Sequence, residues 1–187
     1  DGTPLDSDQN AGVDQLNDAP TSTTTTNYPK SGDPSTTATI NPSYTNAWVV
    51  TSTINVPVSD GSLIQGITLT LHVNYPRASE LSAVLISPGG VAIQLFGNLP
   101  SNGKLTGQDI VFSDSSSVSI DSGSAPYFGR FSPEQPMLSS LLNTNSAGVW
   151  TLQIKNNGTN GGTLVNWSMQ LVTSAPNAGA GATSADV

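Results

Sequence analysis

The sequence has no cysteine, a single histidine and few charged residues. No disulfide or thiol chemistry is therefore available to this 187-residue chain. Both a Ser-His-Asp triad and a zinc site would depend on His72, which lies inside an alternating, strand-like run among Thr and Asn. The chain also lacks a phosphate-binding glycine loop and any recognisable pair of carboxylates. These absences predict a protein without catalytic residues.

Positive charge is scarce as well. Five Lys and Arg residues stand against thirteen Asp and Glu residues, which gives a formal net charge of −8. A nucleic-acid partner is therefore excluded, because phosphate binding needs a basic patch. No stretch approaches the roughly 20 apolar residues of a membrane span. The polar but weakly charged composition favours a secreted or cell-surface protein, and it is typical of bacteria.

The chain divides into four segments by composition. Residues 1–20 are acidic and contain five Asp but no Lys or Arg. Residues 21–39, rich in Thr, Ser and Pro, are predicted to form an extended linker or arm. The tail at 174–187 is similarly poor in residues that can be buried. Residues 40–173 are the one segment expected to form a hydrophobic core.

Within residues 40–173 the apolar residues recur with a period of two. In ITLTLHVNY (67–75) the apolar residues share one face, which indicates a half-buried strand. LSAVLIS (81–87) is apolar on both faces and is predicted to be a central strand, followed by a turn at SPGG (87–90). The only helical pattern is one turn in PMLSSLLN (136–143). We therefore expect an all-β, antiparallel sandwich.

Two tryptophans lie near the end of this segment, in VWTLQI (149–154) and TLVNWSMQL (163–171). Each of Trp150 and Trp167 falls on the more apolar side of its run. An exposed binding platform would place the rings among polar neighbours instead. We therefore predict that both rings are core residues of a closing hairpin.

Three stretches resemble the P domain, the β-sandwich that follows the catalytic domain in kexin- and furin-like convertases and in many bacterial subtilisin-like proteases. They are ELSAVLISPGGVAIQLF (80–96), PYFGRFSPEQPMLSSLLNTNSAGVWTLQI (126–154) and GGTLVNWSMQL (161–171). Order and spacing agree over residues 49–172. Glu80 stands where the family usually has Asp, and it keeps the charge with a longer reach.

The resemblance implies a jelly-roll sandwich of the galactose-binding-like type, without catalytic residues of its own. Such domains accompany a protease, support its folding and stability, or contact its substrate. Some members bind calcium. A loop calcium site here would draw on some of the acidic residues of the core segment, and the alternative, which the sequence favours, is that these residues are surface charges. The candidates are Glu80, Asp109, Asp114, Asp121 and Glu134.

A second resemblance lies in DSDQNAGVDQLNDAP (6–20), which is similar to a thrombospondin type 3 repeat. Closely spaced carboxylate and amide oxygens suit calcium. Ala11 stands where the repeat has Gly, and a disordered acidic tail is the alternative. The candidate ligands are Asp6, Asp8, Asn10, Asp14, Asn17 and Asp18.

Two functional hypotheses follow. In the first, the chain is an extracellular accessory module that stabilises or targets a secreted subtilisin-like protease, or a surface protein, through contacts with the adjacent protease domain or with a protein substrate. In the second, it is a self-assembling filament or surface-layer subunit. Copies of the chain would then pair through the N-terminal arm, whose Thr run has high β-propensity.

Overall fold

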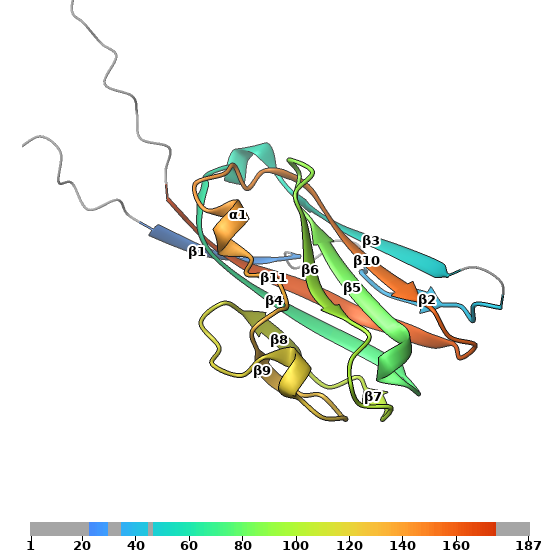
Figure 1. Cartoon of the computed structure of the whole chain (residues 1–187). Helices are drawn as coiled ribbons and strands as arrows, with labels where there is room; N and C mark the ends of the chain where they lie inside the picture. Colours follow the sequence, from blue (N-terminus) through green and yellow to red (C-terminus); the bar gives the residue numbers. More distant parts are fainter. Residues whose placement is uncertain (1–22, 30–34, 45–46, 175–187) are drawn as a thin grey trace, which may run out of the picture.

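The computed structural model describes residues 23–29, 35–44 and 47–174. Within these ranges the chain forms two β-sheets packed on one hydrophobic core (Figure 1). This confirms the predicted all-β sandwich. No helix in the described residues is long and apolar enough to cross a membrane.

The larger sheet has seven strands, five of which run in the order β1-β11-β4-β8-β9. β2 also pairs with β11, and β7 pairs with β4. All pairings are antiparallel except that of β8 with β9. The strands are β1 (Thr23–Tyr28), β2 (Ala38–Ile40), β4 (Leu63–Tyr75), β7 (Leu105–Thr106), β8 (Ile110–Ser113), β9 (Gly129–Phe131) and β11 (Gly162–Ser174).

The smaller sheet has four antiparallel strands in the order β3-β10-β5-β6. Its two outer strands are therefore β3 and β6. The strands are β3 (Trp48–Val56), β5 (Leu81–Ile86), β6 (Ala92–Gly97) and β10 (Gly148–Asn156). Three 3₁₀ turns, Val58–Asp60, Ala78–Glu80 and Ile120–Ser122, and the one-turn helix α1 (Leu138–Leu141) complete the described elements.

Alternation along the strands builds the core. Ile67, Leu69, Leu71 and Val73 of β4 are all buried, as their shared face predicted. β5 lies between β10 and β6, which confirms the central strand. The turn after it closes with a hydrogen bond from Gly90 N–H to Ser87 O, and Gly90 adopts φ +83°. Only glycine takes up that conformation readily.

The Thr-rich arm differs from its prediction. Residues 23–28, expected to be part of an extended linker, form β1 and pair along their full length with β11 of the same chain. The reason is Tyr28, whose ring is buried and whose hydroxyl donates to Asp60 Oδ2 at 2.8 Å. The buried ring anchors the end of the β-prone Thr run, and the ladder with β11 holds the rest of the strand.

Candidate functional site

Both tryptophans of the closing hairpin lie in the core. Trp150 and Trp167 are almost completely buried. The indole N–H of Trp150 donates to Ser146 O, and that of Trp167 donates to Ser52 Oγ, both at 2.9 Å. The prediction that these rings are structural is confirmed, so a binding function has to be sought elsewhere on the molecule.

His72 lies on the outward face of β4, opposite Asn166 of β11. Its Nε2 contacts the carboxylate of Asp109, which precedes β8. The contact is a cross-strand pairing on the surface of the larger sheet. It gives the imidazole a carboxylate partner, but the described contacts place no serine hydroxyl against the ring.

The five acidic residues considered as calcium ligands are not brought together. Asp109 faces His72, and Asp114 accepts the N–H groups of Met137 and Leu138 at the start of α1. Of the five, Asp121 and Glu134 are neighbours. Among the described residues no three acidic or histidine side chains form a group that could hold a metal. The N-terminal candidates, Asp6 to Asp18, lie outside the described residues.

Glu80 belongs to a hydrogen-bonded network at one end of the sandwich. Its carboxylate accepts from the side-chain amide of Asn160 at 2.9 and 3.0 Å and lies 2.9 Å from the Tyr75 hydroxyl. Burial raises the pKa of Tyr75, and the Glu80 carboxylate raises it further. A Cβ at position 158 would overlap this carboxylate, so Gly158 allows the β10–β11 loop to close over it. Glu80 thus fixes a loop.

The free side of β6 is covered by the chain that follows β9. The N–H of Gln94 donates to the side-chain carbonyl of Gln135 at 2.8 Å, and Gln135 N–H donates to Gln94 O at 3.0 Å. Glu134 N–H donates to Leu95 O, while its carboxylate accepts Gly97 N–H at 2.6 Å. Outward backbone groups of Gln94, Leu95 and Gly97 therefore have hydrogen-bond partners, which an outer strand otherwise lacks.

The Glu134 carboxyl is electrostatically perturbed. Partial loss of solvent raises its pKa, the hydrogen bond from Gly97 lowers it, and the adjacent Asp121 carboxylate raises it again. The overall direction is upward. The side chain that covers β6 therefore takes up a proton more readily than an ordinary glutamate.

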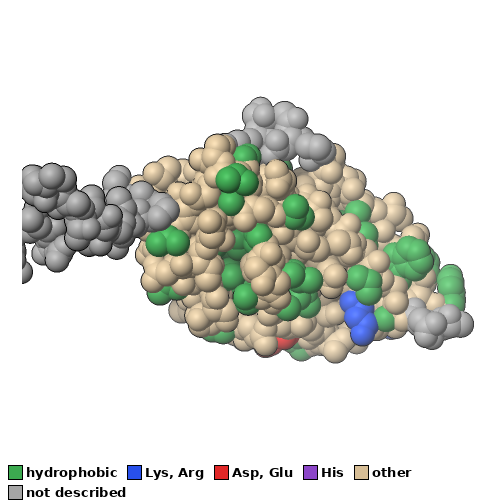
Figure 2. All heavy atoms as spheres, turned by 90° about the horizontal axis from the view of Figure 1, so that it is seen from above, with side chains coloured by type: hydrophobic (Ala, Val, Ile, Leu, Met, Phe, Trp, Pro, Cys, Tyr) green, Lys and Arg blue, Asp and Glu red, His purple; other side chains and the backbone are tan. Residues whose placement is uncertain are grey.

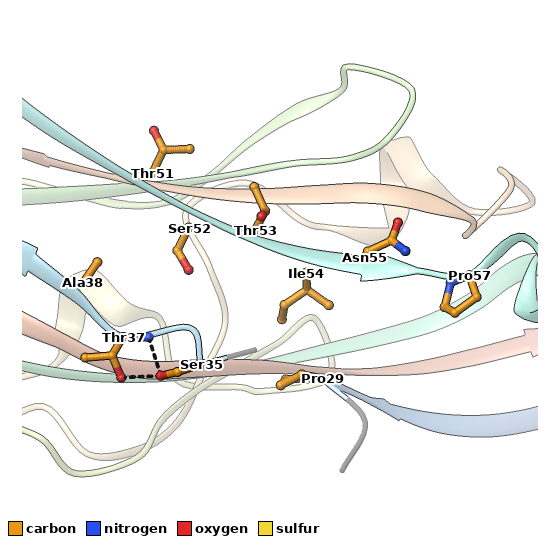
Figure 3. Close-up of a pocket in the computed structure, with 10 residues that line it drawn as sticks. All are labelled: Pro29, Ser35, Thr37, Ala38, Thr51, Ser52, Thr53, Ile54, Asn55 and Pro57. Atoms are coloured by element: carbon orange, nitrogen blue, oxygen red, sulfur yellow. Dashed lines mark hydrogen bonds between the residues drawn. The ribbon is translucent and has the colours of Figure 1, made fainter. Parts of the chain in front are cut away.

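The outer side of β3 is unpaired within the part of the chain that the structure describes. No backbone hydrogen bond joins β3 to any described residue outside β10. Beside it lies a hollow of about 500 Å³ between β3 and the segment that leads into β2. The lining residues that the structure describes are all uncharged; they are Pro29, Ser35, Thr37, Ala38, Thr51, Ser52, Thr53, Ile54, Asn55 and Pro57 (Figure 3).

Charge is also scarce within the smaller sheet itself. Lys155 is the one charged residue in the four strands of the smaller sheet. Figure 2 shows a face dominated by neutral side chains, with hydrophobic groups scattered across it, a basic group near one end and an acidic group at the lower edge. An open strand edge beside a neutral hollow is the most site-like feature of the described chain.

Comparison with known proteins places the fold in a family. The profile of the proprotein convertase P-domain matches residues 64–171, more than half of the chain. The chain belongs to the P-domain family. Domains of this family are accessory to a protease rather than catalytic. No curated protein matches the chain significantly.

Two solved structures are similar to this P domain. One is the serine protease of Aeromonas sobria in complex with the chaperone ORF2, with 14% identity and a TM-score of 0.43, covering 82% of this chain and 28% of that one. The other is the same serine protease alone, with 13% identity and a TM-score of 0.42, covering 80% and 27%. The chain spans little more than a quarter of either protein.

Two acidic residues of the P-domain-like motifs thus have structural partners. Glu80 holds the β10–β11 loop and Glu134 covers β6. The sequence did not indicate the open edge of β3, since outer and inner strands share the same alternation. The absence of charge and of proline from WVVTSTINV was the available signal, because exposed edges usually carry one or the other.

Proposed function

We propose that this chain is a non-catalytic, extracellular accessory module that stabilises or targets a secreted subtilisin-like protease through protein–protein contacts. The observation that carries the proposal is the P-domain match over residues 64–171. The described contacts support it. The single histidine faces a carboxylate, and the acidic residues of the motifs serve as structural acceptors.

Exposed apolar side chains supply a first surface on which to look for these contacts. Phe128, in the loop before β9, is 62% exposed and is followed by the exposed Arg130. Large aromatic side chains and arginine are each enriched at protein interfaces. Phe128 is therefore the first residue to change in a test of protease contact.

The test is to produce the subtilisin-like protease domain encoded with this chain, with and without the P domain. We expect lower yield of active protease and a lower melting temperature without it. Phe128→Asp should reproduce part of that loss, whereas Leu142→Asp, at a residue 51% exposed near α1, serves as the matched control. A protease of equal yield and stability in both forms, or a reading frame without a protease, would overturn the proposal.

We also propose that the acidic segment at 6–18 binds calcium. The support is its sequence: alternating carboxylate and amide oxygens of the kind that calcium prefers. Calorimetric titration after chelation should give heat that Asp6→Asn with Asp8→Asn removes. If the heat instead disappears with Asp121→Asn and Glu134→Gln, the calcium site is assigned to these neighbouring carboxylates of the β-sandwich. A titration without heat would remove the calcium proposal altogether.

A further inference from the structure

The edge of β3 combines two features that are needed to bind an extended chain. In an antiparallel pair, every second residue directs its N–H and C=O away from its partner strand. The residues of β3 therefore direct half of their backbone groups away from β10, and no other described residue receives them. The strand runs for nine residues without proline or charge, so nothing in it blocks the addition of another strand.

The hollow beside β3 supplies the second feature. In Figure 3, Ser52 and Ile54 point toward the segment that carries Ser35 and Thr37, whereas Thr51 and Asn55 point the other way. A strand added to β3 would alternate in the same manner. Its residues on one side would enter the hollow, and those on the other would extend the neutral outer face of the sheet.

The lining determines the chemistry of the occupant. Two prolines, Pro29 and Pro57, and the side chains of Ala38 and Ile54 provide apolar surface, and hydroxyl and amide groups provide the rest. A charged side chain in this space would lose water without gaining a partner of opposite charge among the described lining residues, which is unfavourable. Small and medium-sized apolar side chains fit because they need no partner.

We propose that β3 and the hollow beside it bind an extended, uncharged segment of a partner protein as an additional antiparallel or parallel strand. Backbone hydrogen bonds to β3 would supply affinity, and apolar side chains at alternate positions of the segment would supply selectivity. Five consecutive residues of β3, Thr51 to Asn55, line the hollow. The bound segment is accordingly about five to seven residues long, since paired strands advance equally per residue.

A different occupant, β3 of a second copy, fits the observations less well. Antiparallel pairing of two β3 strands would set two sandwiches side by side, and the inward side chains of each strand are already directed into its own hollow and core. Neither hollow would be filled. The proposal does not depend on the accessory role, because an isolated chain would bind the segment with or without a protease.

The test uses the full chain and the blocked heptapeptide Ser-Val-Thr-Val-Ser-Val-Thr as the probe, followed by amide resonances and fluorescence anisotropy. Two N-methylated forms of the probe discriminate the mechanism, one methylated at the odd amides and one at the even amides. Only one set of amides faces β3 in an added strand. We expect one form to bind about tenfold more weakly or worse and the other to bind like the parent, within about twofold.

The amide shifts should map to residues 51–55. Ala38→Asp should abolish binding by placing a charge in the hollow, whereas Ala92→Asp, on the exposed side of β6, should leave binding unchanged. A probe with Glu in place of Val should not bind. Because Ala38 is partly buried, the methylated probes keep the test decisive even if its variant folds poorly.

Three outcomes would overturn the proposal. The first is equal binding of the two methylated probes, which would indicate nonspecific apolar contact. The second is no binding of the parent probe at about 1 mM, an affinity limit too weak for a dedicated site. The third is a concentration-dependent dimer whose amide shifts map to β3 without peptide, which would identify a second copy as the occupant.

Discussion

The two outer strands of the smaller sheet, β3 and β6, differ in how their outward backbone groups are paired. β6 is covered by Glu134 and Gln135, which form hydrogen bonds with outward backbone groups of Gln94, Leu95 and Gly97. β3 has no such cover among the described residues and faces a neutral hollow. Exposed edges tend to attract other chains, and proteins normally protect them. One protected and one open edge in a single sheet therefore indicate that the open edge is available for recognition.

The largest loss of stability is expected where β3 is tied to the opposite sheet. The Trp167 indole donates to Ser52 on β3, and Ser52 Oγ in turn donates to Thr36 O at 3.2 Å. Trp167→Ala removes both the ring and the tie, and we expect a loss of about 3–5 kcal/mol in the free energy of unfolding. Denaturant unfolding measures it. Trp167→Phe keeps most of the ring volume but also lacks the indole N–H, and it should lose clearly less; equal losses would show that the hydrogen bond to Ser52, rather than the ring volume, carries the stabilisation.

A smaller loss is expected when the protected edge is opened. Glu134→Ala leaves Gly97 N–H without its acceptor, and we expect a loss of about 0.5–1.5 kcal/mol. Hydrogen exchange should accelerate at Gly97. Glu134→Gln keeps a carbonyl oxygen in the same place and should restore most of the protection. Unchanged exchange in Glu134→Ala would mean that β6 is no better protected than β3.

The pH dependence of stability should also distinguish the two edges. The folded-state pKa of Glu134 is raised, so between its unfolded and folded values the folded chain binds more protons than the unfolded chain. Stability contributed by this group is therefore present below the unfolded value of about 4.3 and is lost as pH rises through the folded value. Asp121→Asn should lower the Glu134 pKa in a carboxyl NMR titration. A midpoint that does not move would contradict the influence assigned to Asp121.

The smallest effect is expected at β3 itself. Thr53 is exposed, and Thr53→Lys should change the free energy of unfolding by less than about 0.5 kcal/mol. The same substitution at Gln94 of β6 disturbs a half-buried side chain that donates to Phe96 O, and it should cost more. Thermal unfolding of the two variants in parallel provides the measurement. Equal changes in the melting temperatures of the two variants would contradict the proposed difference between β3 and β6.

Local patterns sufficed for most of the sandwich and for little of the site. Period-two alternation identified β4 and the closing hairpin, and a continuous apolar run identified β5, since the burial of strand faces determines which positions are apolar. It missed β1 because Tyr28 is the only bulky apolar residue that the strand presents to the core. It could not find the contact of Glu80 with Asn160, which joins residues 80 positions apart through hydrogen bonds that leave no periodic trace.

The order of the strands has a consequence for how the chain is made. β10 and β11 arrive last during synthesis, yet each lies in the interior of its sheet, between β3 and β5 and between β1 and β4. The early strands cannot join across these positions until residues 148–174 have emerged. The last two strands in the sequence therefore complete the interior of the two sheets. A chain that terminates before them would lack an interior strand in each sheet. Long-range closure of this kind is slow, and strand edges stay exposed until it is complete. A protein that binds unpaired strand edges would therefore act on this chain before residues 148–174 have joined the sheets.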